Sequence, residues 1–327
     1  MNGGIPIDQI YVHRYMLRSG AALNSASVRR EFHGALIKVG DGHGCIHPWP
    51  EFGDAPIDEQ LEMLLSGTTT PLTEIALRCA QIDGEARRKG VSLFDGMPIP
   101  QSHYSWSFGQ DTTPQIERVI EEKWPAIKAK GFANWGETLR FLDCVARASE
   151  SSGLKLRVDF NGCLERHDFE KFCELMPVRV YRHLDLVEDP VPYEAGLWQH
   201  FRDRWGVKLA LDKGWKSGTD GFDAVVVKPS RRDWRIVAGR IQNSPLVLTS
   251  AMDHALGQMF AAYEAAQANA VMPERISYCG LATQHLFEHD EFFEQVSSPS
   301  GFLKLDRTGT GLGFDEALAH VPWKRLT

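Results

Sequence analysis

The sequence predicts an α/β protein in which a β/α barrel follows an N-terminal α+β capping domain. Three observations support this class. The chain has 327 residues, which is enough for one large barrel and a smaller domain. Hydrophobic residues make up 43% of it, as expected for a globular protein with a substantial core. Between residues 98 and 281, short apolar runs alternate with longer amphipathic runs, which is the pattern of repeated βα units.

Eight strands are predicted in this alternating part of the chain. Eight parallel strands joined by helices favour a closed barrel, and an open doubly wound sheet is the alternative. Lys228 follows Asp212 by only 16 residues, so the helix between the fifth and sixth strands is expected to be short or missing. The predicted strands are 98–104, 126–130, 155–160, 184–188, 207–212, 224–228, 246–250 and 276–281.

The N-terminal domain is expected to span residues 1–95. Residues 96–299 would then form the barrel. This division follows the change from mixed helix and strand patterns to regular alternation near residue 96.

Within the capping domain, the apolar run 34–39 predicts a strand. Asp41-Gly42 predicts a hairpin turn, because glycine tolerates the positive φ that such turns require, and 45–49 would return as the partner strand. Helices are predicted from about Asp58 and from about Thr73, the second ending at Gly90.

The composition argues against several classes of partner. The net charge is −7, which disfavours an electrostatic grip on nucleic acid or on an anionic membrane. No apolar run reaches the length of a membrane span. The six cysteines include no Cys-x-x-Cys pair, which indicates reduced thiols and a cytoplasmic protein. The sequence leaves the oligomeric state open and is compatible with a monomer.

Three acidic residues end three consecutive predicted strands: Asp159, Glu188 and Asp212. Adjacent strands lie about 4.8 Å apart, and the active site of a barrel lies at the C-terminal ends of its strands. Three carboxylates that converge there would repel one another unless a cation lay between them. Mg²⁺ prefers oxygen ligands, so these acids predict a magnesium site. The alternative is that each acid is a solvated residue or part of a salt bridge at the rim.

Lysines end the neighbouring strands. Lys130 and Lys228 each close an apolar run, and Lys128 shares a strand face with Lys130 because side chains alternate. On either side of a bound substrate, two such amines could remove a proton or stabilise the negative charge that follows. The pattern predicts abstraction of a proton next to a substrate carboxylate.

These residues resemble those of the enolase superfamily, in particular the muconate cycloisomerase-like subgroup. The resemblance extends from the predicted hairpin to the run Gly309-Thr310-Gly311-Leu312-Gly313, which is similar to a C-terminal closing segment. It implies that the capping domain, 1–95, is closed by a C-terminal tail at about 300–327. It implies a modified TIM (β/α)7β barrel. It also implies Mg²⁺, or Mn²⁺ in its place, held by the three acids, with Lys130 and Lys228 as the catalytic pair.

The finer resemblance is to the o-succinylbenzoate synthase family. Arg157-x-Asp159-x-Asn161 is similar to the third strand of that family, and 248–252 (Leu-Thr-Ser-Ala-Met) to the end of its seventh. The family dehydrates a cyclohexadiene carboxylate in menaquinone synthesis, which implies a carbon–oxygen lyase acting on a small carboxylate. The substrate contacts implied are Lys128, Arg157, Asn161, Thr249, Ser250 and Ala251.

The resemblance also assigns the proton transfers. Lys130 would take the α-proton and, once protonated, assist the loss of hydroxide, while Lys228 would stabilise the enediolate. One residue departs from the pattern: Asp212 is followed by Lys213, where many relatives have glutamate.

Two cap loops are expected to cover the site, at 18–24 and 47–53. Arg18 would meet a substrate carboxylate or lie in solvent, and Trp49 would line the pocket or pack between domains. Two other functions stay open: an N-acylamino acid racemase or dipeptide epimerase on the same scaffold, and a barrel that binds a ligand without catalysis.

Overall fold

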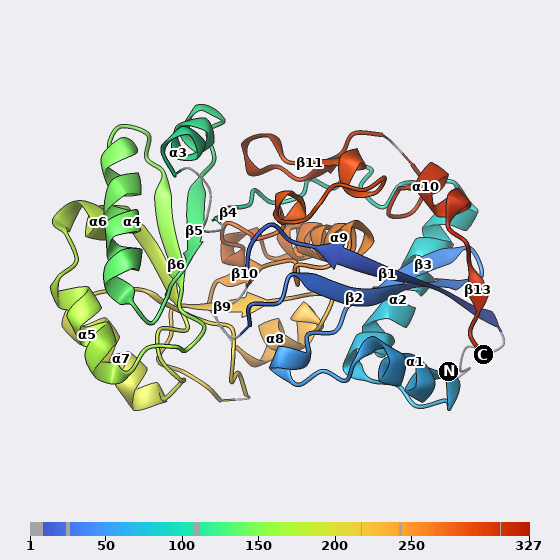
Figure 1. Cartoon of the computed structure of the whole chain (residues 1–327), viewed down its shortest axis with the longest axis horizontal. Helices are drawn as coiled ribbons and strands as arrows, with labels where there is room; N and C mark the ends of the chain where they lie inside the picture. Colours follow the sequence, from blue (N-terminus) through green and yellow to red (C-terminus); the bar gives the residue numbers. More distant parts are fainter. Residues whose placement is uncertain (1–8, 24–26, 107–111, 217, 242–243, 308) are drawn as a thin grey trace.

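The computed structural model describes residues 9–23, 27–106, 112–216, 218–241, 244–307 and 309–327. It consists of a four-stranded antiparallel sheet, a seven-stranded parallel sheet and the helices that cover them. Figure 1 shows the antiparallel sheet with α1 and α2 at one end of the molecule and the strands β5 and β6 with α4 to α7 at the other. Among the described residues, no helix is long and apolar enough to cross a membrane.

The antiparallel sheet forms the cap. Its strand order is β13-β1-β2-β3, so a strand from the end of the chain lies beside the first strand. α2 packs on β3 at close range: Gly42 and Gly44 leave no room for a Cβ against the helix backbone. The cap elements are β1 (Ile10–Arg18), β2 (Glu31–Val39), β3 (Gly42–Ile46), α1 (Ile57–Leu65), α2 (Pro71–Lys89), α10 (Asp315–His320) and β13 (Lys324–Arg325).

The predicted helices of the cap are confirmed, but its strands differ from prediction. α2 begins after a capping box at Thr70 and ends at Gly90, which adopts a left-handed conformation. The hairpin turn lies one residue earlier than predicted, at Gly40-Asp41, and Gly40 carries the positive φ. The return strand β3 begins at Gly42, three residues before its predicted start. β1 was not predicted, because its side chains are mostly exposed or half-buried and give little apolar alternation.

The parallel sheet curls into the barrel, with strand order β10-β9-β8-β7-β6-β5-β4. Its strands are β4 (Tyr104–Trp106), β5 (Ala126–Lys130), β6 (Lys155–Asp159), β7 (Leu184–Glu188), β8 (Leu209–Leu211), β9 (Ala224–Val227) and β10 (Leu246–Leu248). The helices that follow are α3 (Thr112–Glu121), α4 (Trp135–Ala148), α5 (Arg166–Glu174), α6 (Val178–His183), α7 (Ala195–Trp205), α8 (Trp234–Arg240) and α9 (Ala255–Val271). A separate hairpin pairs β11 (Val296–Ser297) with β12 (Lys304–Leu305).

The segment predicted as the eighth strand lies between the two ends of this sheet. It forms isolated parallel bridges, Cys279 with Ser102 on one side and Gly280 with Thr249 on the other. The predicted first strand is likewise reduced to the Ser102 bridge and the short β4 that follows. The eight-stranded barrel is therefore confirmed in outline, although its closing seam is irregular.

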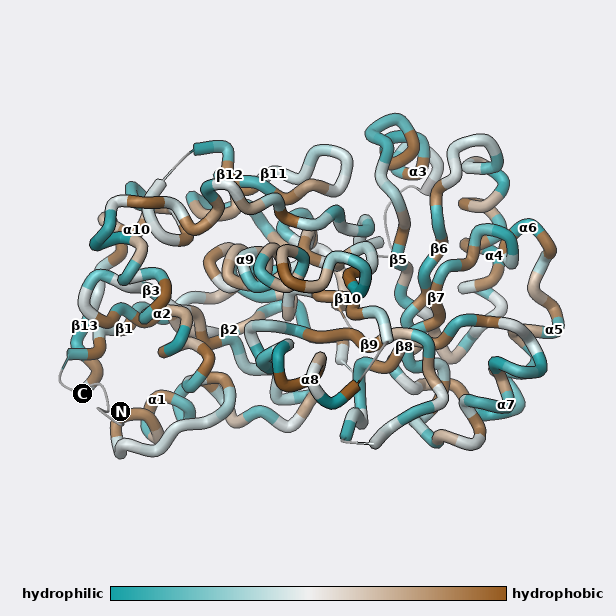
Figure 2. Tube along the Cα trace, turned by 180° about the vertical axis from the view of Figure 1, so that it is seen from behind, coloured by the Kyte–Doolittle hydropathy of each residue, from teal (hydrophilic) through white to brown (hydrophobic). Residues whose placement is uncertain are grey.

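The connection between β8 and β9 contains no helix among its described residues, as the short spacing predicted. The other strands are covered by helices, and the apolar stripe Leu139, Leu142 and Val145 on α4 is buried as expected. In Figure 2 the central strands β6, β7 and β9 are largely hydrophobic, whereas α5 and α7 carry hydrophilic stretches. Burial of these strands on both faces accounts for their continuous apolar runs.

The register of the central strands places their charged ends at one level. Lys130 pairs with Asp159, and Asp159 pairs with Glu188. One layer deeper, Lys128 pairs with Arg157. The ends of β5, β6 and β7 thus face the same opening of the barrel.

Candidate active site

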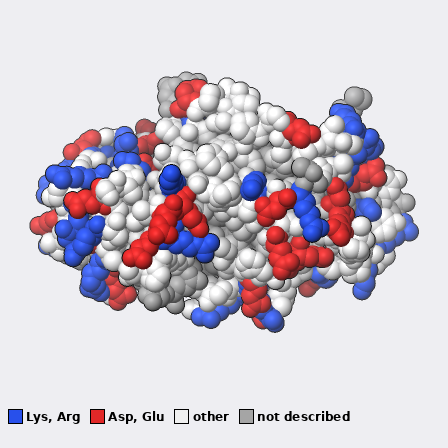
Figure 3. Space-filling model, turned by 90° about the horizontal axis from the view of Figure 1, so that it is seen from above, with Lys and Arg blue, Asp and Glu red and all other residues white. Residues whose placement is uncertain are grey.

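A cavity of about 870 Å³ opens at the C-terminal ends of the barrel strands, beneath the cap. Its floor and walls include every predicted site residue except Arg157. Cap residues line the cavity as well: Ala21, Ala22, Leu23, Trp49, Glu51, Phe52 and Asp54. On the molecular face seen in Figure 3, acidic and basic side chains lie close together, beside broad uncharged areas.

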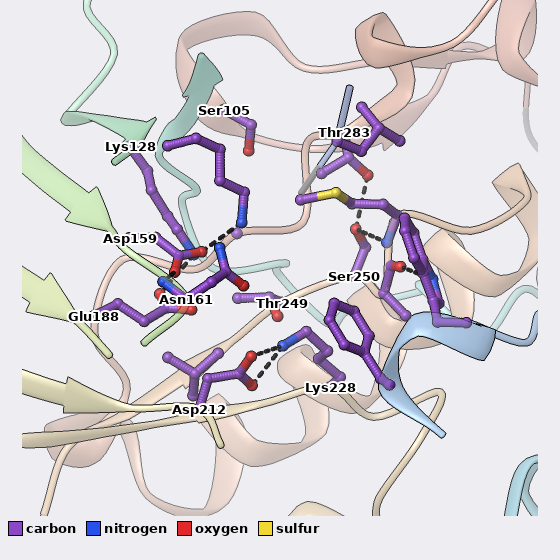
Figure 4. A pocket seen from close by; sticks show the side chains of 18 of the residues that line it. Ser105, Lys128, Asp159, Asn161, Glu188, Asp212, Lys228, Thr249, Ser250 and Thr283 are labelled. Atoms are coloured by element: carbon purple, nitrogen blue, oxygen red, sulfur yellow. Dashed lines mark hydrogen bonds and ion pairs between the residues drawn. The ribbon is translucent and has the colours of Figure 1, made fainter. Parts of the chain in front are cut away.

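The three strand-end carboxylates all line this cavity. Asp159 and Glu188 are 2% and 6% exposed, so both carboxylates lie almost out of solvent. Asp212 follows β8 on the next strand. Figure 4 shows Asp159 and Glu188 side by side, with Asp212 beyond them.

Each strand-end lysine donates to one of these carboxylates. Lys130 Nζ lies 2.6 Å from Asp159 Oδ2. Lys128 Nζ lies 2.6 Å from Glu188 Oε2 and 3.2 Å from Asp159 Oδ2. Lys228 Nζ contacts both oxygens of Asp212 (Figure 4). The cavity therefore has an amine on either flank.

The environments of the charged groups separate their pKa values. Burial raises the pKa of Asp159, but the ammonium groups of Lys128 and Lys130 outweigh it, so the pKa is lowered. The pKa of Asp212 is lowered because Lys228 overcomes the effect of burial. Burial and the nearby Asp159 carboxylate raise the pKa of Glu188. Of these three carboxylates, Glu188 is therefore the one whose charged form is destabilised where the acids converge.

The chemistry of the acids fits a divalent cation. They offer oxygen ligands, which Mg²⁺ prefers, and their mutual repulsion is what a cation would relieve. As the side chains are placed, however, the carboxylates point at lysines. Within the described part of the chain, no group of three His, Cys, Asp or Glu side chains lies close enough to hold a metal ion. The donor types support the predicted site, and binding would require the carboxylates to turn from the ammonium groups.

Asp189, next to Glu188, is a buried acid that the sequence argument missed. Its oxygens accept the backbone N–H groups of Asp212 and Lys213, each at 3.1 Å. Burial and the charge of Asp212 raise its pKa well above the usual range. Its backbone has a positive φ of 40°. Asp189 therefore fixes the chain at the end of β8, where the third carboxylate begins.

Two buried polar atoms of the cavity have no hydrogen-bond partner among the described residues: Asn161 Nδ2 and Thr249 Oγ1. Both residues were predicted to contact substrate, and a bound polar group would satisfy them. Beside them, Ser250 Oγ lies 2.7 Å from Thr283 Oγ1 (Figure 4). Thr283 lines the cavity too, although no sequence pattern indicated it.

Arg157 does not line the cavity, which corrects the prediction that it contacts substrate. Its guanidinium donates to Asp185 Oδ2 at 2.7 Å, to the Tyr278 carbonyl oxygen at 2.6 Å and to Ser277 Oγ at 2.9 Å. It also lies 3.2 Å from His103 Nδ1. Arg157 joins β6 and β7 to the closing segment below the site. We therefore do not retain it as a substrate contact.

The 47–53 loop is fixed to the barrel. Trp49 Nε1 donates to the Ala251 carbonyl oxygen at 2.9 Å, so Trp49 both lines the cavity and packs between cap and barrel. The Asp54 carboxylate accepts hydrogen bonds from both terminal nitrogens of Arg231, at 2.7 and 2.8 Å. Ala251 is thus a backbone anchor for the cap in addition to a cavity residue.

The 18–24 loop contributes the apolar side chains of Ala21, Ala22 and Leu23 to the cavity wall. Arg18 is exposed and pairs with Glu31 at 3.1 Å, in agreement with its interpretation as a solvent-facing residue. Asn24 lies outside the described residues. His254 lies at the start of α9 and accepts the Leu256 N–H, as a helix-start residue does.

Comparison with known proteins identifies the family of the chain. Residues 10–86 match the family model described as the N-terminal domain of O-succinylbenzoate synthase. Over 326 residues the chain is 30% identical to the o-succinylbenzoate synthase of Bdellovibrio bacteriovorus, which covers 95% of this chain and 97% of that protein. The chain belongs to the o-succinylbenzoate synthase family.

Solved structures of the enolase superfamily share the fold of this family member. The mandelate racemase/muconate lactonizing protein from Herpetosiphon aurantiacus matches with a TM-score of 0.73 at 16% identity, over 94% of this chain and 98% of its own. A dipeptide epimerase from Methylococcus capsulatus, complexed with Mg and the dipeptide L-Arg-D-Lys, matches with a TM-score of 0.72 at 15% identity, over 93% and 98%. The modified barrel with an N-terminal cap is therefore the fold of this o-succinylbenzoate synthase family member.

Proposed function

We propose that this chain is a Mg²⁺-assisted carbon–oxygen lyase that forms o-succinylbenzoate by dehydration of a cyclohexadiene carboxylate. The supporting observation is that Lys130 and Lys228 reach one cavity from opposite flanks, with three carboxylates between them. Its sequence identity with an o-succinylbenzoate synthase over nearly the whole chain supports the choice of this reaction. On this proposal the protein acts in menaquinone biosynthesis, in the cytoplasm.

The substrate would be held by its carboxylate at the end of β10. Thr249 and Ser250 present hydroxyl groups there, and Asn161 presents an amide N–H from the β6 end. Lys128 lies one layer below Lys130, where its ammonium group adds positive charge under the carboxylate. These contacts would orient the α-carbon between the two lysines.

Asp159, Glu188 and Asp212 would hold Mg²⁺, with Mn²⁺ as a substitute. When bound, the ion would stabilise negative charge on the substrate carboxylate. Asp189 would keep Asp212 in place through the two backbone N–H groups that it accepts.

Lys130 would remove the α-proton in its neutral amine form. The electron pair of the broken C–H bond would pass into the carboxylate and form an enediolate, which the Lys228 ammonium group would stabilise. Collapse of the enediolate would expel the β-hydroxyl group. The proton now on Lys130 would join that hydroxide, so one water leaves and the ring becomes aromatic.

A direct test is turnover of the ring diene acid with added Mg²⁺. Formation of o-succinylbenzoate, and its loss in Lys130→Ala, would support the proposal.

An isomerase remains the second candidate, because paired lysines also suit a two-base racemisation and a dipeptide epimerase shares the fold. Deuterium from solvent would then appear in recovered acyl amino acids or dipeptides, without release of water.

Binding without catalysis is the third candidate. It requires that Lys130→Ala leave every activity of the protein unchanged. Turnover of any carboxylate that depends on Lys130 would exclude it.

A further inference from the structure

The cavity contains more cations than its acids neutralise. Six of its lining residues are lysine or arginine and five are acidic. Four cations form ion pairs: Lys128 and Lys130 with strand-end acids, Lys228 with Asp212, and Arg231 with Asp54. The fifth acid, Glu51, pairs with Arg29 of the cap, which does not line the cavity. Two lining cations remain.

Those two are Lys213 and Arg232, and in the described part of the chain neither has a carboxylate partner. Lys213 is half-buried, and its Nζ lies 3.2 Å from the Asn161 carbonyl oxygen and 5.0 Å from the centre of the Phe52 ring. Arg232 is exposed, and its guanidinium lies 5.0 Å from the centre of the Trp215 ring. A carbonyl and aromatic faces orient a cation without cancelling its charge.

Their positions in the fold bring these charges to one edge of the cavity. Lys213 follows β8 and Arg232 follows β9, and these two strands are adjacent in the sheet. The Lys213 backbone is fixed by Asp189, and its ammonium group lies beneath Phe52 of the cap loop. The half-buried lysine would meet an anion inside the cavity, and the exposed arginine would meet it at the mouth.

We propose that Lys213 and Arg232 form a second anion subsite, which binds a carboxylate on the substrate tail away from the reacting carbon. This inference rests on the proposed function in naming the substrate class: a dicarboxylate whose second acid ends a short flexible chain. A partly desolvated ammonium–carboxylate contact discriminates strongly against a neutral group of the same shape. Lys213, the half-buried cation of the pair, would then determine the preference for a charged tail.

The test is calorimetric binding to the Mg²⁺-loaded protein, which needs no turnover. Two ligand pairs are compared: o-succinylbenzoate with its tail carboxamide, and an N-acyl amino acid whose acyl chain ends in a carboxylate with the corresponding carboxamide. For at least one pair the wild type should bind the acid at least about 10-fold more tightly. Lys213→Met should reduce that ratio below about 3-fold and leave carboxamide affinity unchanged, while Lys213→Arg should retain most of it.

Arg232→Met should lower the ratio less, because Arg232 is exposed to solvent. Lys208→Met is the matched control, since Lys208 is an exposed lysine just before β8 and outside the cavity. A wild-type acid-to-amide ratio near one for both pairs, or a ratio that Lys213→Met leaves intact, overturns the subsite. The proposed function fails separately, if the ring diene acid is not dehydrated while the acyl amino acid pair still shows the Lys213-dependent ratio.

Discussion

The flank of the cavity formed by β5 to β7 differs in its charges from the flank formed by β8 and β9. On the first, two lysines lie against two carboxylates that are almost fully buried. On the second, Asp212 is the one strand-end acid, its side chain is 18% exposed, and two cations nearby have no carboxylate partner among the described residues. A closed, neutral network suits proton transfer, and an open, cationic edge suits recognition of an anion.

The largest expected effect comes from removing the amine of either flank. Lys130→Ala and Lys228→Ala should each lower kcat by about 10³-fold or more, because each removes a group that acts on the reacting proton or its charge. Lys208→Ala, at an exposed lysine, should keep wild-type kcat. Steady-state rates with the ring diene acid would check this. Equal activity in Lys228→Ala and wild type would show that the second flank has no part in the chemistry.

Loss of a strand-end carboxylate is expected to come next. Chelation should abolish turnover and added Mg²⁺ should restore it, while Asp159→Asn, Glu188→Gln and Asp212→Asn should each weaken metal affinity by about 10- to 100-fold. Mn²⁺ binding followed by electron paramagnetic resonance measures this independently of activity. Unchanged Mn²⁺ affinity in all three variants would contradict the proposed metal site.

Arg157 lies below the cavity, beneath the β5–β7 flank, and its loss should affect stability instead of substrate binding. Arg157→Met leaves Asp185 and the Tyr278 carbonyl without their donor, which should lower the free energy of unfolding by about 3–5 kcal/mol. Urea denaturation measures it, with KM as the companion value. A raised KM at unchanged stability would restore Arg157 as a substrate contact.

Asp189 joins the two flanks, because it follows Glu188 and accepts N–H groups from the end of β8. Asp189→Ala should lower kcat by about 10-fold and weaken Mn²⁺ binding, since two buried N–H groups lose their acceptor. Asp189→Asn keeps one acceptor oxygen and should recover part of both. An identical loss in the two variants would argue against this positioning role.

A last expected effect concerns the interface between cap and barrel, where His47 and His254 are buried. Burial lowers the pKa of His47 and of His254 to about 3. Unfolded histidine titrates near 6.5, so below that pH the unfolded state binds more protons and stability falls. Each histidine should cost about 2 kcal/mol at pH 5 relative to pH 7.5.

His47→Gln is the variant that isolates this term, and urea denaturation at both pH values is the measurement. The variant should lose less stability than wild type on acidification. Asp253 acts in the opposite sense, because burial raises its pKa to about 6, so stability rises as that carboxyl takes up its proton. The quantity to compare is therefore the change in unfolding free energy between the two pH values, in wild type and in His47→Gln. An identical change in both proteins would show that His47 is not buried as a neutral group.

Much of the barrel could be predicted, because each buried parallel strand corresponds to a short apolar run in the sequence that ends at a charged residue. The bounds of β5 and β7 agree with prediction, and the lysines and acids that close these runs meet at one opening. The closing segment and the first strand were harder, since isolated bridges leave no regular pattern in the sequence.

The site residues also differ in how well the sequence could predict their roles. Alternation correctly placed Arg157 on the face shared with Asp159, but it carries no information about depth, and two residues along a strand lower a side chain by about 7 Å. The role of Asp189 was also invisible, because it depends on a backbone with positive φ and on contacts to a strand distant in sequence. Pairing in β1 could not be predicted either, since few of its side chains are buried.

The pairing of β13 with β1 has a consequence for how the molecule is made. During synthesis β1 emerges before the other described strands. The edge of β1 that faces away from β2 stays unpaired until residues 324 and 325 have been synthesised and can pair with it. The barrel elements between them can assemble earlier, so a nascent chain would form the strand ends that line the cavity before the cap above them is complete. Shortening the chain by a few terminal residues would leave the unprotected edge of β1 open to self-association.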